Sequence, residues 1–319
     1  MARSMNRKLP SGVFVTTDSP EFLERRAEPE HRLVDLAAQN CRDIRDAWIA
    51  KQRDFSTTPF DPDGHHLRLF PGGVTIWSGF PGAGKTTLLR QLACHLMQRG
   101  QGVFMASLEE DPADMFVRIA LTAAGKQEPT EADLEWFVFG YADRLRMWGS
   151  IGLARYQELL AMVRVLARGG VRHAIIDSLM CLDVRSDDWE AQRQFSVDLT
   201  TTARLSGCHI HLVAHPRKLV SADAELDLND VAGSADLGRL ADNVVFVRRA
   251  KNEAQISGSV TPMAVSIRKQ RHGTGATGDV TGWFHRNFRQ FHGSQHTTAP
   301  IEYLPAEAYG PPAQEVDFS

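Results

Sequence analysis

Hydrophobic and polar residues follow a regular block pattern along the chain from Leu67 onward. Short apolar runs, of the kind that form buried strands, are separated by longer segments in which apolar residues recur at helical spacing. Strands that alternate with amphipathic helices are typical of a parallel sheet covered by helices. The pattern therefore predicts an α/β fold with a mostly parallel, twisted sheet and helices on both faces.

The apolar runs predict the strands one by one. Six runs are predicted to be strands: VTIWS (74–78), GVFMAS (102–107), RLRMW (144–148), VRHAIID (171–177), CHIHLVA (208–214) and DNVVFV (242–247). Two later segments, TPMAVSIRKQ (261–270) and DVTGWFH (279–285), are predicted to close the sheet with antiparallel pairing. No internal repeat is visible between these elements.

The longer segments between the strands predict helices. They are TTLLRQLACHLMQRG (86–100), DPADMFVRIALTAAG (111–125), a segment from Thr130, ARYQELLAMVRVLARGG (154–170) and residues 189–206. Gly100 and Gly125 lie where the first two helices are expected to end. Asp111 is the expected cap of the second helix, with Pro112 in its first turn.

Three segments differ in composition. Residues 1–62 are polar and charged and are predicted to form a short helical N-terminal extension and a turn-rich linker. Residues 63–295 contain the predicted sheet and form the main domain. Residues 296–319 are predicted to be an acidic, disordered tail, because four acidic residues and no lysine or arginine follow position 300.

Charge and cysteine usage exclude several classes of protein. The formal net charge of -3 argues against a protein that coats nucleic acid by bulk charge. The four cysteines are far apart and form no C-x-x-C pair, so neither a zinc site nor a disulfide framework is indicated, and a reducing cytoplasm is expected. No apolar stretch approaches the roughly 20 residues that span a bilayer, so no contact with a membrane is expected.

A local basic segment stands out against this balanced charge. Residues 244–292 contain eight lysines and arginines and only two acidic residues. This segment fits either a phosphate-binding surface or an ordinary solvated basic face.

The stretch GFPGAGKT (79–86) matches the pattern G-x-x-x-x-G-K-[ST] between a predicted strand and a predicted helix, which is the context that a phosphate-binding loop requires. Glycines let backbone N–H groups and the helix N-terminus point at phosphate oxygens. Lys85 is expected to neutralise the β- and γ-phosphates, and Thr86 to hold Mg²⁺. ATP and Mg²⁺ are therefore the predicted ligands, and the predicted loop residues are Gly79, Pro81, Gly82, Ala83, Gly84, Lys85, Thr86 and Thr87.

Acidic residues at the ends of two predicted strands are candidates for the rest of this site. Asp177 is expected to bind the metal, although an aspartate there also serves as a cap or turn former. Many P-loop ATPases have a catalytic glutamate at the next position, where this chain has Ser178, so the base must lie elsewhere. Glu109, at the end of the second strand, is the candidate for polarising the attacking water. For Glu110 and Asp111, a role in the site and a role as favourable charges at the N-terminus of the next helix fit equally well.

Six motifs in this order carry a family resemblance: GFPGAGKT, SLEE, HAIIDSL, VAHPRK, DVAGSADLGRLADNVVFVRR and RKQRHGTGATGDV. They resemble the RecA-type ATPase core, and more narrowly the replicative ring helicases, which include DnaB, the helicase half of phage primase-helicases and Twinkle. The resemblance runs from about Leu67 to about Phe291. It implies a RecA-like P-loop NTPase core, ATP hydrolysis with Mg²⁺, a homo-oligomeric, hexameric ring, and 5′ to 3′ translocation on single-stranded DNA.

The resemblance also implies roles for individual residues. His215 would sense the γ-phosphate at the edge of the sheet, although a lone histidine at a strand end is often only structural. Arg217 and Lys218 would begin a loop that lines the channel and contacts DNA phosphates. Gly233 and Ser234 match a family position where backbone amides approach the strand. Such contacts carry little sequence information, so DNA binding is expected to be salt-sensitive and largely sequence-neutral.

Ring ATPases complete each site with a cation from the neighbouring subunit. By resemblance, Arg249 matches the finger of the phage type, and Lys269 and Arg271 match the DnaB pair. We expect Arg249 and Arg271 to act together with support from Lys269. Each of the three also fits a solvated surface charge.

Three functions are consistent with these residues. The first is a replicative helicase that acts on single-stranded DNA and forked duplex in the cytoplasm of a bacterial or phage-infected cell. The alternatives are a recombination mediator or regulatory switch that does not unwind DNA, and a nucleotide-gated assembly module with negligible turnover.

The acidic tail, through Phe318, is a candidate docking site for a replisome partner. Residues 20–50 fit either a linker helix on the adjacent subunit or a helix folded on its own core.

Overall fold

The structure is a computed structural model that describes residues 45–46, 48–49, 54–185, 187–216, 227–231, 235–249, 258–272 and 277–304. The chain divides into two units, residues 1–54 and 55–319. In the first unit, the described residues Arg45, Asp46, Trp48 and Ile49 are helical. The second unit contains the sheet.

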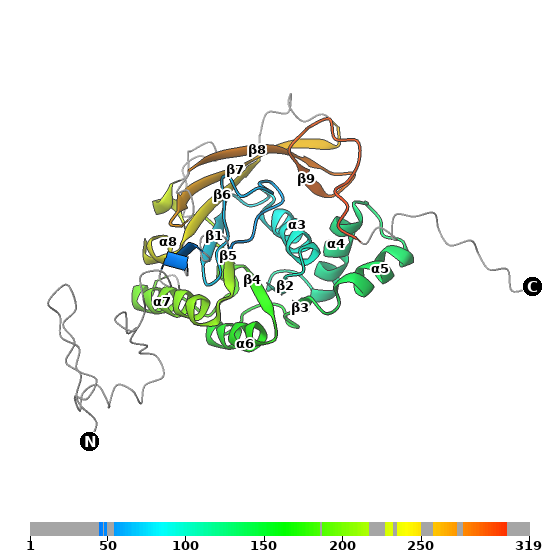
Figure 1. Ribbon diagram of the computed structural model, residues 1–319. Helices are drawn as coiled ribbons and strands as arrows, with labels where there is room; N and C mark the ends of the chain where they lie inside the picture. Colours follow the sequence, from blue (N-terminus) through cyan, green and yellow to red (C-terminus); the bar gives the residue numbers. More distant parts are fainter. Residues whose placement is uncertain are drawn as a thin grey trace, which may run out of the picture. The chain divides into compact units, whose positions relative to one another are not determined.

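One sheet of nine strands runs through the second unit in the order β3-β2-β4-β5-β1-β6-β7-β8-β9 (Figure 1). The strands are β1 (Val74–Ser78), β2 (Gly102–Ser107), β3 (Leu145–Met147), β4 (Val171–Asp177), β5 (His209–Val213), β6 (Asn243–Arg249), β7 (Val260–Gln270), β8 (Gly278–His285) and β9 (Gln290–His292). Strands β1 to β6 pair in parallel, and β7 to β9 extend the sheet with antiparallel pairing. The predicted α/β fold with a mostly parallel sheet is confirmed.

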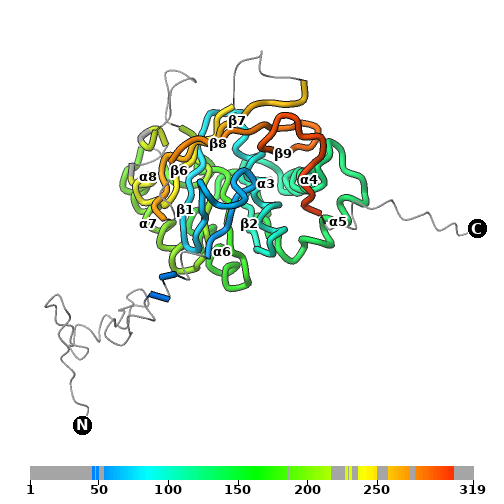
Figure 2. Tube along the Cα trace, turned by 45° about the horizontal axis from the view of Figure 1, so that its top comes forward, coloured from blue at the N-terminus to red at the C-terminus, as the bar shows by residue number. Residues whose placement is uncertain are grey.

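Helices cover both faces of the parallel strands, as Figures 1 and 2 show. The helices are α3 (Lys85–Gln98), α4 (Pro112–Ala124), α5 (Glu131–Tyr141), α6 (Tyr156–Arg168), α7 (Trp189–Ser206) and α8 (Ala235–Leu240), with short 3-10 helices at Leu179–Cys181 and Leu228–Asp230. Buried side chains of α3, α4 and α5 form one core on the first face, and those of α6, α7 and α8 form a second core on the opposite face. Two cores on one sheet explain why the central strands are buried on both faces and mostly apolar.

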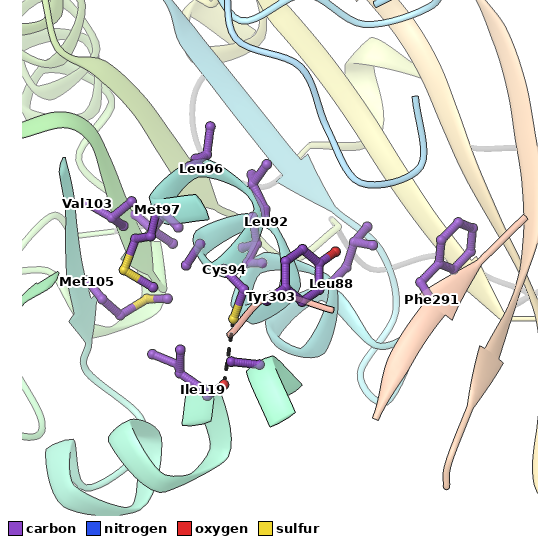
Figure 3. Packing of buried hydrophobic residues seen from close by; sticks show 14 of the residues in the cluster. Leu88, Leu92, Cys94, Leu96, Met97, Val103, Met105, Ile119, Phe291 and Tyr303 are labelled. Carbon is purple, nitrogen blue, oxygen red and sulfur yellow. Dashed lines mark hydrogen bonds between the residues drawn. The ribbon is translucent and has the colours of Figure 1, made fainter. Parts of the chain in front are cut away.

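Helix α3 is buried along most of its length (Figure 3). Leu88 and Leu92 face the core, and the Cys94 thiol donates to the Ile119 carbonyl of α4 at 3.6 Å. Tyr303, from the C-terminal segment, packs against the same helix and accepts a hydrogen bond from the Gln91 side chain at 3.1 Å. Packing on several sides holds the N-terminus of α3 in a fixed position relative to β1.

The predicted caps of α4 are confirmed. The Asp111 carboxylate accepts a hydrogen bond from the Ala113 backbone N–H at 2.8 Å, and Pro112 is the first helical residue. Gly125 ends the helix in the left-handed conformation, with φ of 66°. The strands and helices predicted between residues 74 and 285 all form, and α8 and the three-residue β9 are additions that apolar periodicity did not indicate. Most of the predicted helical extension within residues 1–62 lies outside the described residues.

The disorder predicted from composition does not extend to residues 301–304. Tyr303 and Leu304 are 1% and 5% exposed and belong to the core around α3. The Tyr141 hydroxyl donates to the Tyr303 carbonyl. The prediction averaged over a long acidic segment and so missed two apolar side chains that pack at its beginning. Residues 305–319, including Phe318, lie outside the described residues.

Three buried histidines form a stacked cluster on the α3 face of the sheet. The ring nitrogens of His173 and His211 lie 3.1 Å apart, and the Trp77 indole N–H donates to His211 Nδ1 at 3.1 Å. His209 contacts the Thr75 hydroxyl at 2.8 Å. Burial lowers the pKa of all three imidazoles, to about 4 for His209. The cluster is therefore neutral at physiological pH.

Acidification is expected to destabilise the protein through this cluster. Below about pH 6.5 the unfolded chain binds protons at these histidines that the folded chain does not bind, so the free energy of unfolding falls as pH drops from about 6.5 toward 4. Each histidine contributes about 1.4 kcal/mol per pH unit within that window. Urea denaturation at a series of pH values measures the slope, and His209→Asn should reduce it. An equal slope in this variant would contradict the assignment.

Candidate functional site

Residues 79–84 join β1 to α3 in a tight loop that requires glycine at two close approaches. Gly79 has φ of 145°, and a Cβ there would lie 2.3 Å from the Val247 carbonyl oxygen of β6. Gly84 has φ of 95°, and its Cβ would lie 2.9 Å from the Met263 side chain. Other residues would be strained at both positions, so the spacing of the glycines follows from the geometry of the loop.

The N-terminus of α3 has the features of an anion site. Gly84 is the N-cap residue and provides no side chain to bond the first N–H groups of the helix. These groups carry the positive end of the helix dipole and favour a negatively charged ligand. The loop and the helix start therefore fit a phosphate chain.

Lys85 adds a buried positive charge to this anion site. Its ammonium donates to the Gly79 carbonyl at 2.8 Å and to the Phe80 carbonyl at 3.1 Å. Burial lowers the pKa of Lys85, and the nearby carboxylates of Asp177 and Glu109 oppose this shift. A buried ammonium beside uncapped N–H groups favours binding of an anion to the loop.

The structure brings Thr86 and Asp177, the two predicted metal-binding residues, into contact. The Thr86 hydroxyl donates to the Asp177 carboxylate at 2.6 Å. Asp177 ends β4 and is 6% exposed, and burial raises its pKa although the Thr86 hydrogen bond opposes this shift. No described group of three or more histidine, cysteine or acidic side chains could hold a metal by itself. The hydroxyl and carboxylate fit Mg²⁺, which takes its remaining ligands from phosphates and water.

Glu109 lies at the same edge of the sheet, after β2. Its carboxylate accepts a hydrogen bond from the Ser178 hydroxyl and lies 3.8 Å from His215 Nε2, at the end of β5. Burial lowers the pKa of His215, nearby Lys85 adds to this effect, and Glu109 opposes it. The ends of β2, β4 and β5 thus bring a carboxylate, a hydroxyl and a neutral imidazole together. The sequence did not predict the contact of Ser178, because its only signal was its place after Asp177.

A pocket of about 430 Å³ opens beside the phosphate loop. Its lining residues come from the loop, α3 and strands β6 to β8: Gly82, Ala83, Gly84, Thr87, Arg249, Thr261, Met263, Phe284 and Arg286. Arg249 therefore lies next to the loop of its own chain, where its guanidinium donates to the Thr261 hydroxyl at 3.4 Å. Phe284 and Arg286 were not predicted, because no local motif marks them.

Lys269 and Arg271 lie at the opposite end of the sheet from the phosphate loop. Lys269 donates to the Gly238 carbonyl at 2.9 Å, and Arg271 lies 3.5 Å from the Asp242 carboxylate. Asp242 also accepts from the backbone N–H of Val74, where β1 begins. Burial lowers the pKa of Lys269 to about 8, and Arg271 adds to the shift. Neither cation can reach the loop that follows the other end of β1 in its own chain.

The predicted DNA-contacting residues Arg217, Lys218, Gly233 and Ser234 lie outside the described residues. Pro216, directly before Arg217, and Val231, two residues before Gly233, are described. Pro216, next to His215, forms an antiparallel bridge with Val231. The described chain before Arg217 therefore ends directly beside the Glu109 and His215 contact.

The fold and the phosphate loop define a RecA-like P-loop NTPase domain. A family model described as AAA domain matches residues 46–220, more than half of the chain. The chain belongs to this family. In the described part of the chain, no helix is long and apolar enough to cross a bilayer.

The chain is similar in sequence or fold to several other proteins. The chain is 25% identical over 225 residues to the Twinkle homolog protein, chloroplastic/mitochondrial, of Arabidopsis thaliana, and the match covers 64% of this chain and only 31% of that relative. Its fold is similar to a solved ATPase domain, with a TM-score of 0.60, 21% identity, and coverage of 70% of this chain and 85% of that domain. It is also similar to a DnaB-like replicative helicase studied for its interactions with primase, with a TM-score of 0.58, 20% identity, and coverage of 69% and 58%. The predicted resemblance to RecA-type replicative helicases is confirmed.

Proposed function

We propose that this chain is the motor of a replicative DNA helicase, which hydrolyses ATP, translocates along single-stranded DNA in the 5′ to 3′ direction as a hexameric ring, and unwinds duplex DNA. The observation that carries the proposal is the 3.8 Å approach of Glu109 to His215 at the base of the segment with Arg217 and Lys218. One group at the phosphate site thus lies next to the start of the candidate DNA loop. The Twinkle homolog and the DnaB-like helicase support the same function.

The residues of the site have complementary roles in hydrolysis. The uncapped N-terminus of α3 and Lys85 bind the phosphates and stabilise charge that develops on them. Glu109 accepts a hydrogen bond from the attacking water and orients it, and Ser178 fixes one of its oxygens. Thr86 and Asp177 would hold Mg²⁺, which when bound neutralises phosphate charge. His215, neutral because of burial, donates a hydrogen bond to the terminal phosphate and reports its loss through Pro216.

We propose that the base and ribose of ATP lie in the pocket beside the loop. Arg249 and Phe284 can contact the base face, since a guanidinium and an aromatic ring both stack on π systems. This position favours a contact in cis for Arg249 over the predicted role as a finger in trans. Lys269 and Arg271, far from the loop of their own chain, remain the proposed fingers for a neighbouring subunit.

Arg249→Ala separates these two roles. A contact in cis predicts that the KM for ATP rises about 3- to 10-fold while kcat changes little, since one stacked cation is lost. A finger in trans predicts unchanged binding and a loss of turnover. Steady-state hydrolysis and binding of a fluorescent ATP analogue measure both quantities. Arg155→Ala, which removes an exposed cation at the start of α6, is the control. Normal binding with lost turnover would contradict the contact in cis.

Loss of the two loop cations tests the coupling to DNA. Arg217→Ala with Lys218→Ala is expected to leave hydrolysis without DNA intact and to abolish its stimulation by single-stranded DNA, because phosphate contacts supply most of the affinity. Hydrolysis with and without single-stranded DNA, at two salt concentrations, measures the effect. Stimulation at the wild-type level in this variant would refute the assignment of the loop.

A further inference from the structure

The Arg90–Glu110 ion pair lies beside the site, and none of the roles above involves it. Arg90 is one helical turn after Thr86, so both side chains lie on the same face of α3. Thr86 bonds Asp177 after β4, and the Arg90 guanidinium donates to both carboxylate oxygens of Glu110, after β2, at 2.7 Å. One face of α3 thus contacts the carboxyl ends of two neighbouring strands.

The burial of Arg90 makes this pair hard to break. Its side chain is 8% exposed and that of Glu110 is 34% exposed. Burial lowers the pKa of Arg90, and Glu110 opposes this shift. The guanidinium also contacts the Met115 sulfur at 3.2 Å, and Arg118 lies 3.5 Å from Glu110. Because a buried charge without its partner is strongly unfavourable, Glu110 stays on α3.

Glu109 and Glu110 are neighbours in sequence, and their carboxylates lie on different sides of the segment after β2. Glu109 contacts Ser178 and His215, whereas Glu110 contacts Arg90 of α3 and Arg118 of α4. The backbone between the two residues is therefore held from both sides. If the Glu110 contact is lost, the segment loses its anchor on α3, although Glu109 keeps its own contacts and Leu108 keeps its backbone hydrogen bonds.

We propose that Arg90 and Glu110 are positioning residues, which hold the Glu109 carboxylate at the place where it orients the attacking water. The proposal rests on the proposed function, in which Glu109 is the base. The pair touches no reacting atom and acts only through Glu109. A pair that merely joins α3 to the segment after β2 would stabilise the fold without this effect.

Hydrolysis by a set of variants separates positioning from simple stabilisation. Glu110→Gln is expected to lower kcat about 10- to 100-fold with little change in the KM for ATP, because a misplaced group loses rate more than binding. In the Glu109→Gln background, Glu110→Gln is expected to cause no further loss. Lys126→Met, which breaks the comparable pair of Lys126 with Asp133 at 2.7 Å, should leave kcat unchanged. Losses that multiply in the double variant, or a normal kcat in Glu110→Gln, would overturn the proposal.

A titration of His215 tests the same positioning without any hydrolysis. Glu109 raises the pKa of His215 against burial and Lys85, so Glu109→Gln is expected to lower that pKa. Glu110→Gln should lower it in the same direction, because the carboxylate moves away, whereas Lys126→Met should not. NMR of the imidazole signals measures the pKa, and His215→Gln identifies the signal. A wild-type protein that hydrolyses no ATP would refute the proposed function, whereas an unchanged pKa in Glu110→Gln would refute positioning.

Discussion

Replacing Lys85 with alanine is expected to reduce ATP hydrolysis by about 100-fold or more, since the phosphates lose their buried positive partner. The Lys85 ammonium donates to the carbonyls of Gly79 and Phe80, which hold it within the loop. Phosphate release at saturating ATP measures the loss. A thermal melt shows whether the variant stays folded.

The control for this variant is Arg155→Ala, because the Arg155 side chain is exposed and donates to the Glu158 carboxylate at 3.4 Å, away from the loop. Hydrolysis by this control should equal that of the wild type. Hydrolysis at the wild-type rate by folded Lys85→Ala would contradict the assignment of the phosphate loop.

Glu109→Gln is expected to lower kcat by about 100- to 10,000-fold with ATP binding retained, as for removal of a general base. Glutamine has the same shape and still accepts the hydrogen bond from Ser178, so the loop around β2 should keep its structure. Single-turnover hydrolysis and binding of a fluorescent ATP analogue measure the two effects. Glu158→Gln, on the exposed face of α6, is the matched control. A kcat near the wild-type value would exclude Glu109 as the base.

Local signals were sufficient for the fold and for part of the site. The parallel strands are mostly apolar because both faces are buried. Asp111 marks the start of α4 through its side-chain cap, and Gly125 marks its end through its left-handed conformation. The glycines of residues 79–84 are dictated by a turn between β1 and α3, so the motif and its structural context agree. Such features depend on neighbours in sequence and can be predicted from one chain.

Contacts between distant segments could not be predicted in the same way. Arg90 and Glu110 belong to segments separated by β2, and nothing in either segment marks the other as its partner. Arg249 and Arg271 were grouped as fingers, yet β6 and the end of β7 place them at opposite ends of the sheet. The two arginines lie at opposite ends because β6 and β7 run in opposite directions. A sequence motif does not contain the direction of a strand.

Composition is a poor guide to burial where individual side chains in a polar or acidic segment pack into the core. Tyr303 and Leu304 belong to the segment that was predicted to be a disordered tail because of its acidic composition. Their apolar side chains are instead buried against α3. The three histidines of β4 and β5 look polar in sequence, and hydrogen bonds to Thr75 and Trp77 allow them to be buried. A polar residue whose hydrogen bonds are satisfied can occupy a core position.

Strand separation on a forked duplex tests the central claim most directly. We predict that the protein with ATP and Mg²⁺ separates the strands, that a non-hydrolysable ATP analogue does not support this reaction, and that single-stranded DNA stimulates hydrolysis in the same mixture. Hydrolysis that single-stranded DNA stimulates without any strand separation would contradict a helicase and indicate a mediator of recombination instead.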